Sequence, residues 1–405
     1  MHVAVIGGGA SGMAAAYAAA INGAKTILFE KNEKLGKKLF ISGKGRCNLT
    51  NDSDIQNHLA NVVDNPRFLY SAYNAFSPVD LMRLMTEAGV SLKTERGDRV
   101  FPLSDKSSDI ISAWQKLLLK SNVDIHLNET VLSFDKKDAS FAIKTDQKQY
   151  TFDKLIIATG GFTYQATGST GDGYRFARSF GHSIVPLRPS LVGIKAVIPT
   201  SLAGLSLKNC EITVKKSEKV LFSEFGEMLF THSGISGPIV LTASAKINNL
   251  PFEELMIYLD LKPAITMETL DQRLIRELTA GGSKALKNRM PELLPKSLIE
   301  PILEQAGLDP LTPCHSITKA DRLRLALLLK AFPIKPIGLE AFNGAIVTAG
   351  GVNVKEVDPK DMQSKLVSGL YFAGELLDVD ALTGGYNLQI AFSTGYLAGR
   401  SAANA

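Results

Sequence analysis

The chain has 405 residues, of which 45% are apolar and 21% charged, so it is a folded protein of more than one domain rather than a disordered one. Lysine and arginine (45) exceed aspartate and glutamate (40) by five, which permits an anionic partner without requiring one. Three cysteines, Cys47, Cys210 and Cys314, match neither a disulfide framework nor a metal site, and a reducing cytoplasmic location is expected. No apolar run reaches the roughly 20 residues of a membrane span, and none has the flanks of a signal peptide.

A glycine-rich turn follows the first predicted strand. Residues 2–6, His-Val-Ala-Val-Ile, are typical of a buried parallel strand, and a helix is expected to run to about residue 22. Between them lie Gly7, Gly9, Ala10, Ser11 and Gly12, which contain a G-x-G-x-x-G motif. In this motif the first glycine permits a tight turn, the second admits a phosphate, and the third allows close packing of helix on strand. The segment therefore predicts a pyrophosphate site at a helix N-terminus.

The second predicted strand, residues 25–29, ends on Glu30. In dinucleotide-binding folds an acid at this distance past the glycines accepts hydrogen bonds from ribose hydroxyls. The combination of strand, glycine turn, helix and acid predicts dinucleotide binding. The alternative, a glycine-rich turn that binds nothing, leaves Glu30 unexplained.

The next segment indicates which dinucleotide is bound. Residues 31–46 contain six basic residues and one acid. An NAD dehydrogenase would continue its βαβ pattern here, whereas a basic, glycine-rich loop predicts a strand pair that wraps a longer cofactor, FAD. The candidate cofactor contacts of this loop are Lys31, Lys38, Gly43, Gly45, Arg46, Cys47 and Asn48.

Two later segments are predicted to return to the same cofactor. One is a buried strand that begins at residue 154 and ends in Ala158-Thr159-Gly160. The other contains Gly374, Glu375 and Asp378, then Gly384, Gly385, Tyr386, Asn387 and Leu388 at the start of a helix expected to reach residue 398. That helix N-terminus would stabilise negative charge on the N1–C2=O edge of a reduced flavin. Glu375 and Asp378 would contact the ribityl or pyrophosphate part, or else they only cap the helix start.

Six motifs occur in order along nearly the whole chain: Gly-Lys-Gly-Arg-Cys-Asn (43–48), Thr-Gly-Ser-Thr-Gly-Asp-Gly-Tyr (167–174), Leu-Phe-Thr-His-Ser-Gly-Ile-Ser-Gly-Pro (229–238), Thr-Ala-Gly-Gly-Val (348–352), Gly-Glu-Leu-Leu-Asp (374–378) and Thr-Gly-Gly-Tyr-Asn (383–387). In these motifs the sequence resembles the BaiN/RdsA family of FAD-dependent oxidoreductases. The resemblance implies bound FAD, a three-part architecture and use of NADH or NADPH. Members include dihydrouridine synthases of large-subunit ribosomal RNA, aminoacetone oxidases and a branch linked to bile-acid reduction. The resemblance therefore indicates the cofactor better than the substrate.

The expected fold is α/β, with a discontinuous Rossmann-like FAD-binding domain formed by residues 1–190 and 341–405. A β domain, 191–263, and a small helical domain, 264–340, are expected to be inserted in it. Residues 211–215 and 255–259 are typical of antiparallel strands. Leu270, Leu274 and Leu278, and then Leu323 and Leu327, have helical spacing.

The helical insert carries the candidate nucleic-acid surface. Residues 261–335 contain twelve lysines and arginines against eight acids, with Arg273, Arg276, Lys284, Lys287 and Arg289 close together in sequence. This cluster predicts either contacts to the phosphates of structured RNA or an ordinary solvated helix face.

Two residues are candidates for proton transfer. Cys47 lies beside Lys44 and Arg46, which would lower a thiol pKa, and it is either a general acid or a small residue packed beneath the flavin. His232, among glycines, is either a proton donor or a hydrogen-bonded loop residue. The sequence has no second G-x-G-x-x-G and no paired-cysteine redox motif, so electrons are expected to reach the flavin directly, from transiently bound NAD(P)H or from the substrate.

These observations predict an FAD-dependent oxidoreductase. The preferred reaction is NAD(P)H-driven reduction of a uridine to dihydrouridine in large-subunit ribosomal RNA. The alternatives are an oxidase of small amines that uses oxygen, and a non-catalytic flavin-bearing RNA-binding or assembly protein.

Overall fold

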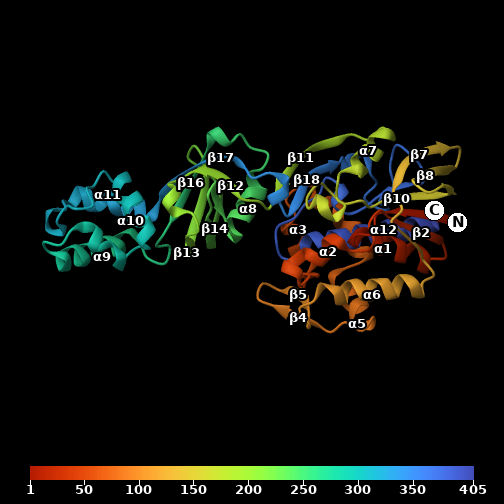
Figure 1. Ribbon diagram of the computed structural model, residues 1–405, viewed down its shortest axis with the longest axis horizontal. Coiled ribbons are helices and arrows are strands. Elements are labelled where there is room, and N and C mark those ends of the chain that lie inside the picture. The colour runs from red at the N-terminus through yellow and green to blue at the C-terminus, as the bar shows by residue number, and fades with distance from the viewer. The chain divides into compact units, whose positions relative to one another are not determined.

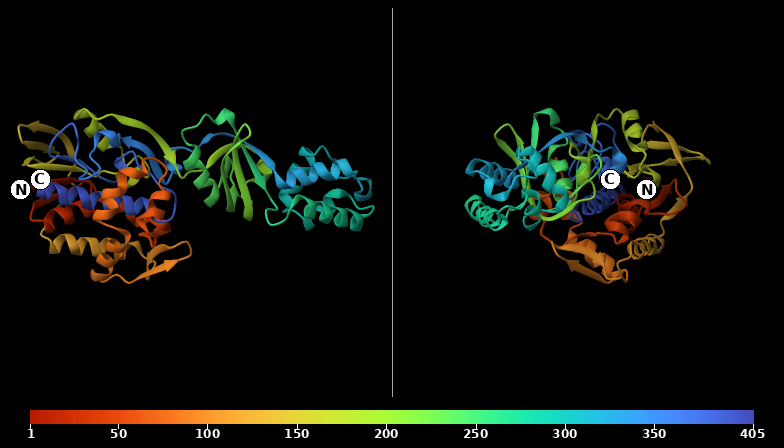
Figure 2. Two further views of the ribbon diagram at one scale, coloured as in Figure 1. Left: turned by 180° about the vertical axis from the view of Figure 1, so that it is seen from behind. Right: turned by 60° about the vertical axis from the view of Figure 1, so that its left-hand side comes forward.

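The computed structural model describes all 405 residues, and the chain forms two compact units (Figure 1). Unit 1 comprises Met1–Ser190 and Phe342–Ala405, and unit 2 comprises Leu191–Ala341. The two ends of the chain therefore meet in one unit, and Figure 2 shows the red start and the blue end of the chain side by side there.

A five-stranded parallel sheet is the centre of unit 1. Its strands stand in the order β19 (Leu370–Phe372), β10 (Lys154–Ile157), β1 (His2–Ile6), β2 (Lys25–Glu30) and β6 (Asp124–Leu127). The chain leaves β1 toward β2 on one side and returns on its other side through β10. In sheets of this order, ligands bind beside the carboxyl ends of the strands where the order reverses.

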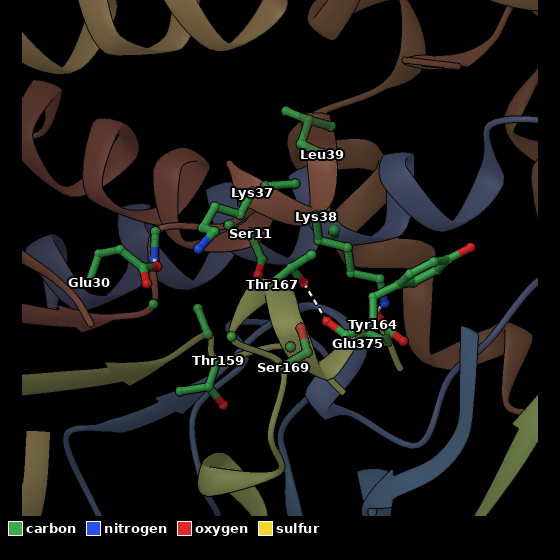
Figure 3. Close-up of a pocket in the computed structure, with 18 of the residues that line it drawn as sticks. Ser11, Glu30, Lys37, Lys38, Leu39, Thr159, Tyr164, Thr167, Ser169 and Glu375 are labelled. Atoms are coloured by element: carbon green, nitrogen blue, oxygen red, sulfur yellow. Dashed lines mark hydrogen bonds and ion pairs between the residues drawn. The ribbon is translucent and has the colours of Figure 1, made fainter. Parts of the chain in front are cut away.

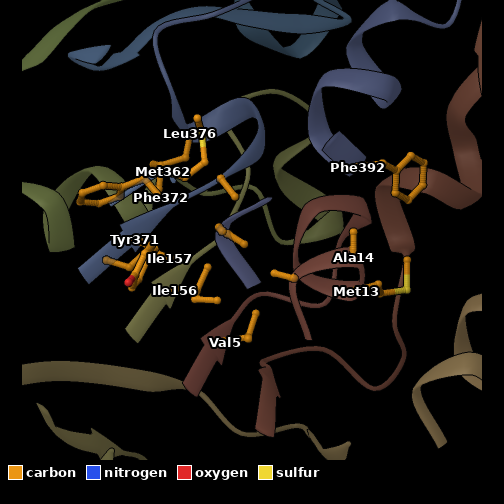
Figure 4. Close-up of a cluster of buried hydrophobic side chains, with 14 of the residues drawn as sticks. Val5, Met13, Ala14, Ile156, Ile157, Met362, Tyr371, Phe372, Leu376 and Phe392 are labelled. Carbon is orange, nitrogen blue, oxygen red and sulfur yellow. The ribbon is translucent and has the colours of Figure 1, made fainter. Parts of the chain in front are cut away.

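Two helices lie against this sheet, α1 (Ala10–Ile21) and α12 (Tyr386–Asn404), and α6 (Ser107–Lys120) packs against α1. The buried ring of Trp114 on α6 stacks on Phe392 of α12, with ring centroids 5.2 Å apart. Figure 4 shows Phe392 and Met13 on the helices and Val5 and Ile156 on the strands, within the core formed between the two layers.

Helix α1, near the start of the chain, packs directly on α12, near the end of the chain. Two glycines of α12 let the two helix backbones come into contact. A Cβ on Gly395 would lie 2.1 Å from the Ser11 carbonyl oxygen, and one on Gly399 would lie 2.0 Å from that of Ala15. Real side chains do not approach this closely, so the contact requires glycine at both positions.

Replacing Gly399 with alanine should lower the free energy of unfolding by about 2 kcal/mol, because the new methyl group forces the two helices apart. The gain of about 1 kcal/mol in helix propensity offsets only part of this cost. Thermal or urea denaturation measures the change. Ser401→Ala, at a half-buried position on the same helix, should stay within about 0.5 kcal/mol of wild type. Equal stabilities for Gly399→Ala and wild type would contradict the close packing.

The remaining elements of unit 1 surround this core. Antiparallel sheets are formed by β3 (Thr50–Asn51), β5 (Arg99–Pro102) and β4 (Leu92–Glu95), by β7 (Val131–Lys137), β8 (Ser140–Thr145) and β9 (Gln149–Phe152), and by β11 (Ile184–Ser190) with β18 (Val347–Val352). The other helices are α2 (Lys37–Ile41), α3 (Ile55–Ala60), α4 (Tyr70–Ala75), α5 (Pro78–Glu87) and α7 (Asp172–Ser179). Where the sequence predicted a strand pair after residue 31, the chain forms α2 and a glycine turn, so that prediction was wrong.

Unit 2 is a closed barrel with helices attached. The barrel order is β12 (Ile194–Val197), β15 (Gly234–Ser236), β14 (Lys219–Phe230), β13 (Ser206–Lys216), β16 (Leu255–Asp260) and β17 (Phe332–Leu339). The helices are α8 (Pro238–Ile247), α9 (Met267–Gly281), α10 (Lys296–Gln305) and α11 (Lys319–Lys330). One hydrophobic core runs through barrel and helices.

Two details of unit 2 differ from the sequence prediction. Residues 332–339, assigned above to the helical insert, form β17 and pair with β12 and β16, so the helices interrupt the barrel between two of its strands. Leu270, Leu274 and Leu278 are buried as expected, but Leu323 and Leu327 are 37% and 59% exposed. Helix α11 buries Leu325, Ala326 and Leu329 instead, because it is apolar on more than one face.

Candidate cofactor site

The glycine turn after β1 has the geometry that the sequence predicted. Gly7 has φ +105°, and a Cβ there would lie 2.6 Å from the Ala158 carbonyl oxygen. A Cβ on Gly12 would lie 1.7 Å from the Gly7 carbonyl oxygen. Around Gly9 no atom lies within 4 Å of the Cβ position, so this glycine alone faces open space. Gly9 also begins α1, which has no side-chain cap and no acid in its first turn, so its N–H groups are available to a phosphate.

Glu30 is held at the end of β2 by three hydrogen bonds. Its Oε2 accepts from the Gly8 N–H (2.7 Å), and its Oε1 accepts from the Asn32 N–H (2.9 Å) and from Asn32 Nδ2 (2.6 Å). A carboxylate offers about four lone-pair sites, so capacity remains for a ribose hydroxyl. The carboxylate is therefore both fixed in place and able to accept a further donor.

These groups lie along one cavity of about 570 Å³ in unit 1 (Figure 3). The cavity follows the carboxyl ends of β1, β2 and β10 and reaches the residues after β19. Fourteen of the residues proposed from the sequence as cofactor contacts line it: Gly7, Gly9, Ala10, Ser11, Glu30, Lys31, Lys38, Gly43, Ala158, Thr159, Gly160, Glu375, Asn387 and Leu388. Segments more than 300 positions apart in the sequence thus share one wall.

A hydrogen-bonded ion pair lies at the end of the cavity away from Glu30. Lys38 Nζ donates to Glu375 Oε2 (2.5 Å) and to Thr163 Oγ1 (2.7 Å). Glu375 Oε1 also accepts from the Thr348 N–H (2.9 Å). Helix α2 and the segment after β19 are thereby fixed against each other, with a positive charge held on the cavity wall.

A second ion pair joins the basic loop to α7. Lys31 Nζ donates to Asp172 Oδ2 (2.7 Å) and to Thr170 Oγ1 (2.6 Å). Burial opposes ionisation of Asp172, but the hydrogen bonds from Lys31 and Thr170 outweigh it and lower the pKa of this carboxyl. The carboxylate is therefore charged at neutral pH and orients the Lys31 side chain.

The start of α12 is held on the cavity by β3. A Cβ on Gly385 would lie 2.3 Å from the Thr50 carbonyl oxygen, and Thr50 Oγ1 donates to Gln389 Oε1 (2.6 Å). The Asn48 side-chain oxygen accepts from the Gly385 N–H (3.0 Å). Asn387 Oδ1 accepts from the Ala381 N–H (2.9 Å) and so closes the preceding turn. The first turn of α12 carries neither a side-chain cap nor an acid, so its N–H groups can face an electron-rich ligand.

Ten proposed contacts do not line the cavity: Gly12, Gly45, Arg46, Cys47, Asn48, Gly374, Asp378, Gly384, Gly385 and Tyr386. Most of these ten residues support residues that line the cavity. Gly12, Gly385 and Asn48 hold the helix starts, and Gly374 packs on the Ser11 side chain. Arg46 pairs instead with Asp105 (2.6 Å) and Glu95 and lies over the Phe101 ring. Asp378 accepts from Asn65 Nδ2 (3.1 Å).

Neither candidate proton donor lines the cavity. Cys47 is fully buried, and this burial raises the pKa of its thiol to about 12 rather than lowering it, since Lys44 and Arg46 do not neutralise the cost of burial. Its burial fits a small packed residue rather than a general acid. His232 is exposed after β14 in unit 2.

The sequence analysis missed several cavity residues. They include Asn32, Lys37, Leu39, Ile41, Ser42, Lys44, Tyr164, Thr167 and Ile346. The loop from Gly168 to Gly173 with Asp172 was interpreted from the sequence either as a cofactor-flanking loop or as a plain turn before a helix, and Gly168, Ser169 and Asp172 line the cavity. No sequence motif contains Tyr164 or Ile346, so their place on the cavity wall could not be predicted from the sequence.

The basic cluster of the helical insert is partly neutralised. Arg289 pairs with Glu277, and Arg273 donates to the Glu292 carbonyl oxygen (3.0 Å). Arg276, Lys284 and Lys287 are exposed. Three rather than five of the predicted side chains are thus presented to solvent.

No group of three or more histidines, cysteines, aspartates and glutamates is placed to hold a metal ion. No helix is both long and apolar enough to cross a membrane.

A parallel sheet in this order, with a glycine turn and an acid at its carboxyl edge, defines a Rossmann-type dinucleotide-binding oxidoreductase, and the expected α/β fold class is confirmed. The chain belongs to the HI0933-like family, whose model of the Rossmann domain matches residues 1–401. The resemblance drawn from the motifs is thereby confirmed.

Two named relatives align over almost the full length. The chain is 32% identical to a 3-dehydro-bile acid delta(4,6)-reductase of Clostridium scindens, over 99% of both chains. It is 32% identical to a ribosomal RNA dihydrouridine synthase of Escherichia coli, over 97% of this chain and 95% of that one. Among solved structures, a 3-ketosteroid-delta4-(5alpha)-dehydrogenase of Rhodococcus jostii superposes with a TM-score of 0.54 at 15% identity, over 99% of this chain and 96% of that one, which supports the fold.

Proposed function

We propose that this chain is an FAD-dependent oxidoreductase, driven by NADH or NADPH, that reduces a uridine to dihydrouridine in large-subunit ribosomal RNA. The observation that carries the proposal is the single cavity, which runs from Glu30 and the Gly9 turn to the Lys38–Glu375 pair and the start of α12. Similarity to a ribosomal RNA dihydrouridine synthase along 97% of the chain supports the substrate. A cytoplasmic location fits a ribosomal substrate.

The residues of the cavity fit FAD from end to end. Open space at Gly9 and the free start of α1 suit the pyrophosphate, and the remaining lone pair of Glu30 suits the adenosine ribose. Lys38 and Glu375 would hold the ribityl part. The N–H groups at the start of α12 would stabilise the negative N1–C2=O edge of the reduced ring.

Reduction of uridine adds a hydride to one carbon of the C5–C6 double bond and a proton to the other. FAD, when bound, supplies hydride transfer, and NAD(P)H would supply the electrons. The chain orients the ring and provides the proton. His232, an exposed residue of unit 2, is kept as our proposed proton donor because an imidazole side chain can give up a proton.

The test uses the purified protein with bound FAD. We expect NADH or NADPH to bleach the flavin absorbance rapidly, and an unmodified large-subunit ribosomal RNA transcript to reoxidise it with one dihydrouridine formed, as measured by mass spectrometry. Reduction of the flavin by aminoacetone with release of peroxide would favour the amine oxidase instead. A flavin that stays reduced in the presence of RNA would contradict the proposed substrate.

A further inference from the structure

We propose that Tyr164, together with Ile41 and Ile346 of the same cavity lining, is the platform on which the substrate's uracil ring stacks. The inference rests on the proposed function, because it names the residues that receive the base. All three side chains line the same cavity in unit 1. None of the three was singled out by the sequence motifs.

The position of Tyr164 along the cavity supports this role. Figure 3 shows Glu30 at one end of the cavity and Tyr164 at the other, with the tyrosine ring extending away from Glu30. Because the glycine turn and Glu30 suit the adenosine diphosphate half of FAD, the redox-active ring must lie toward Lys38, Leu388 and Tyr164. A substrate ring has to meet the flavin at that end.

Three large apolar side chains that line this cavity are also exposed to solvent. Tyr164 is 37% exposed, Ile41 is 40% exposed and Ile346 is 37% exposed. A flat, uncharged ring that covers them would remove this apolar surface from water. Stacking on an aromatic side chain is the usual way in which proteins receive an unpaired base.

The backbone at Tyr164 is held in one conformation by hydrogen bonds. Its φ of +54° lies in the left-handed region, which costs free energy for a residue other than glycine. The conformation is held because the Thr167 N–H and Thr167 Oγ1 both donate to the Tyr164 carbonyl oxygen, each at 2.7 Å. Thr163 Oγ1 donates to the Ile346 carbonyl oxygen (3.2 Å), which ties Ile346 to the same turn.

The charge beside the ring also suits a base. Lys38 Nζ lies 5.7 Å from the Tyr164 ring centroid, within the range of a cation–π contact, and is itself fixed by Glu375 and Thr163. This contact orients the ring from one side and leaves the exposed part of the ring for a ligand. Tyr164 is thus a preorganised aromatic surface rather than a mobile loop side chain.

The test measures binding of single-stranded hexauridylate to the oxidised holoenzyme, followed by the change in flavin absorbance. We expect Tyr164→Phe to bind within twofold of wild type, and Tyr164→Leu to bind at least tenfold more weakly. Tyr164→Gly should also bind at least tenfold more weakly while its thermal stability is unchanged or higher, since glycine adopts the left-handed backbone without strain. This last variant separates a loss of binding from a failure to fold.

Two controls test whether a loss of hexauridylate binding comes from the missing Tyr164 ring. Tyr70→Leu removes another exposed tyrosine of unit 1, outside the cavity, and should bind as wild type does. The dissociation constant for FAD, measured on the apoprotein, should stay within twofold in all the variants. Three results would overturn the platform. They are a large loss of FAD affinity in Tyr164→Leu, a loss of hexauridylate binding in Tyr164→Phe as large as that in Tyr164→Leu, and no hexauridylate binding by the wild-type protein. Because this measurement needs no turnover, its result is independent of whether dihydrouridine is formed.

Discussion

A Gly9→Val protein should fold as wild type does but bind FAD at least a hundredfold more weakly. No atom lies within 4 Å of the Cβ position at Gly9, and its backbone φ of −81° suits any residue. The valine side chain would therefore project into the cavity where the pyrophosphate is proposed to lie. A hundredfold loss corresponds to about 2.7 kcal/mol of binding free energy. Titration of the apoprotein with FAD, followed by flavin fluorescence, measures it.

Gly12→Ala is the matched comparison for Gly9→Val. A methyl group there would lie 1.7 Å from the Gly7 carbonyl oxygen, so this smaller change should impair folding itself. Thermal unfolding of the apoproteins should therefore give a melting temperature for Gly9→Val close to that of wild type and a clearly lower one for Gly12→Ala. FAD binding by Gly9→Val at wild-type affinity would show that the pyrophosphate lies elsewhere.

Asp380→Asn should make the protein more stable at pH 8, by up to about 4 kcal/mol. Asp380 is 1% exposed, its Oδ2 accepts from Ser190 Oγ (2.7 Å), and its Oδ1 has no hydrogen-bond partner. Burial raises the pKa of Asp380 to about 7, with smaller increases from Asp64 and Asp378 and opposing effects of Ser190 and Arg188. The amide avoids the cost of a buried charge because it is neutral at every pH. The figure follows from about 1.4 kcal/mol for each unit of difference from an ordinary aspartate.

The stability advantage of Asp380→Asn over wild type should depend on pH. Since the folded-state pKa of Asp380 lies above the unfolded value of about 3.9, the folded protein holds the proton more tightly. The stability that this carboxyl contributes is complete below about pH 4 and is lost as the pH rises to about 7. The advantage of Asp380→Asn should therefore shrink from pH 8 to pH 5, as urea denaturation at both values can measure. Asp135→Asn, at an exposed position of β7, should show no such trend. An advantage of Asp380→Asn that is equal at both pH values would contradict the buried, raised-pKa carboxyl.

Local sequence patterns predicted the glycine turn after β1 and its two flanking strands well. Gly7, Gly9, Gly12 and Glu30 lie where the motif places them, and the strands before and after the turn begin and end within a residue or two of the prediction. This succeeds because the turn, the helix start and the acid are set by backbone geometry within about 30 residues. The later segments that carry Ala158 and Glu375 reached the same cavity because parallel strands bring their carboxyl ends to one edge.

The side chains of the basic loop were much less predictable. Arg46 was expected to contact the cofactor, but its partners Glu95 and Asp105 lie on and beside a hairpin some 50 residues away. Cys47 was expected to have a lowered pKa from its charged neighbours in sequence. The folded chain buries the thiol and directs Arg46 elsewhere. Neighbours in sequence do not determine electrostatics when side chains on adjacent residues point in different directions.

The amino-acid sequence by itself determined the family, the α/β class and the glycine turn of this protein, because each depends on short segments whose conformation is local. Tertiary structure alone decided that Lys38 meets Glu375, that Tyr164 and Ile346 line one cavity, and that Asp380 is buried beside Ser190. The two residues of each pair are 180 or more positions apart in the sequence. Such contacts form only when the whole core packs, since no periodicity or motif in either segment carries information about the other.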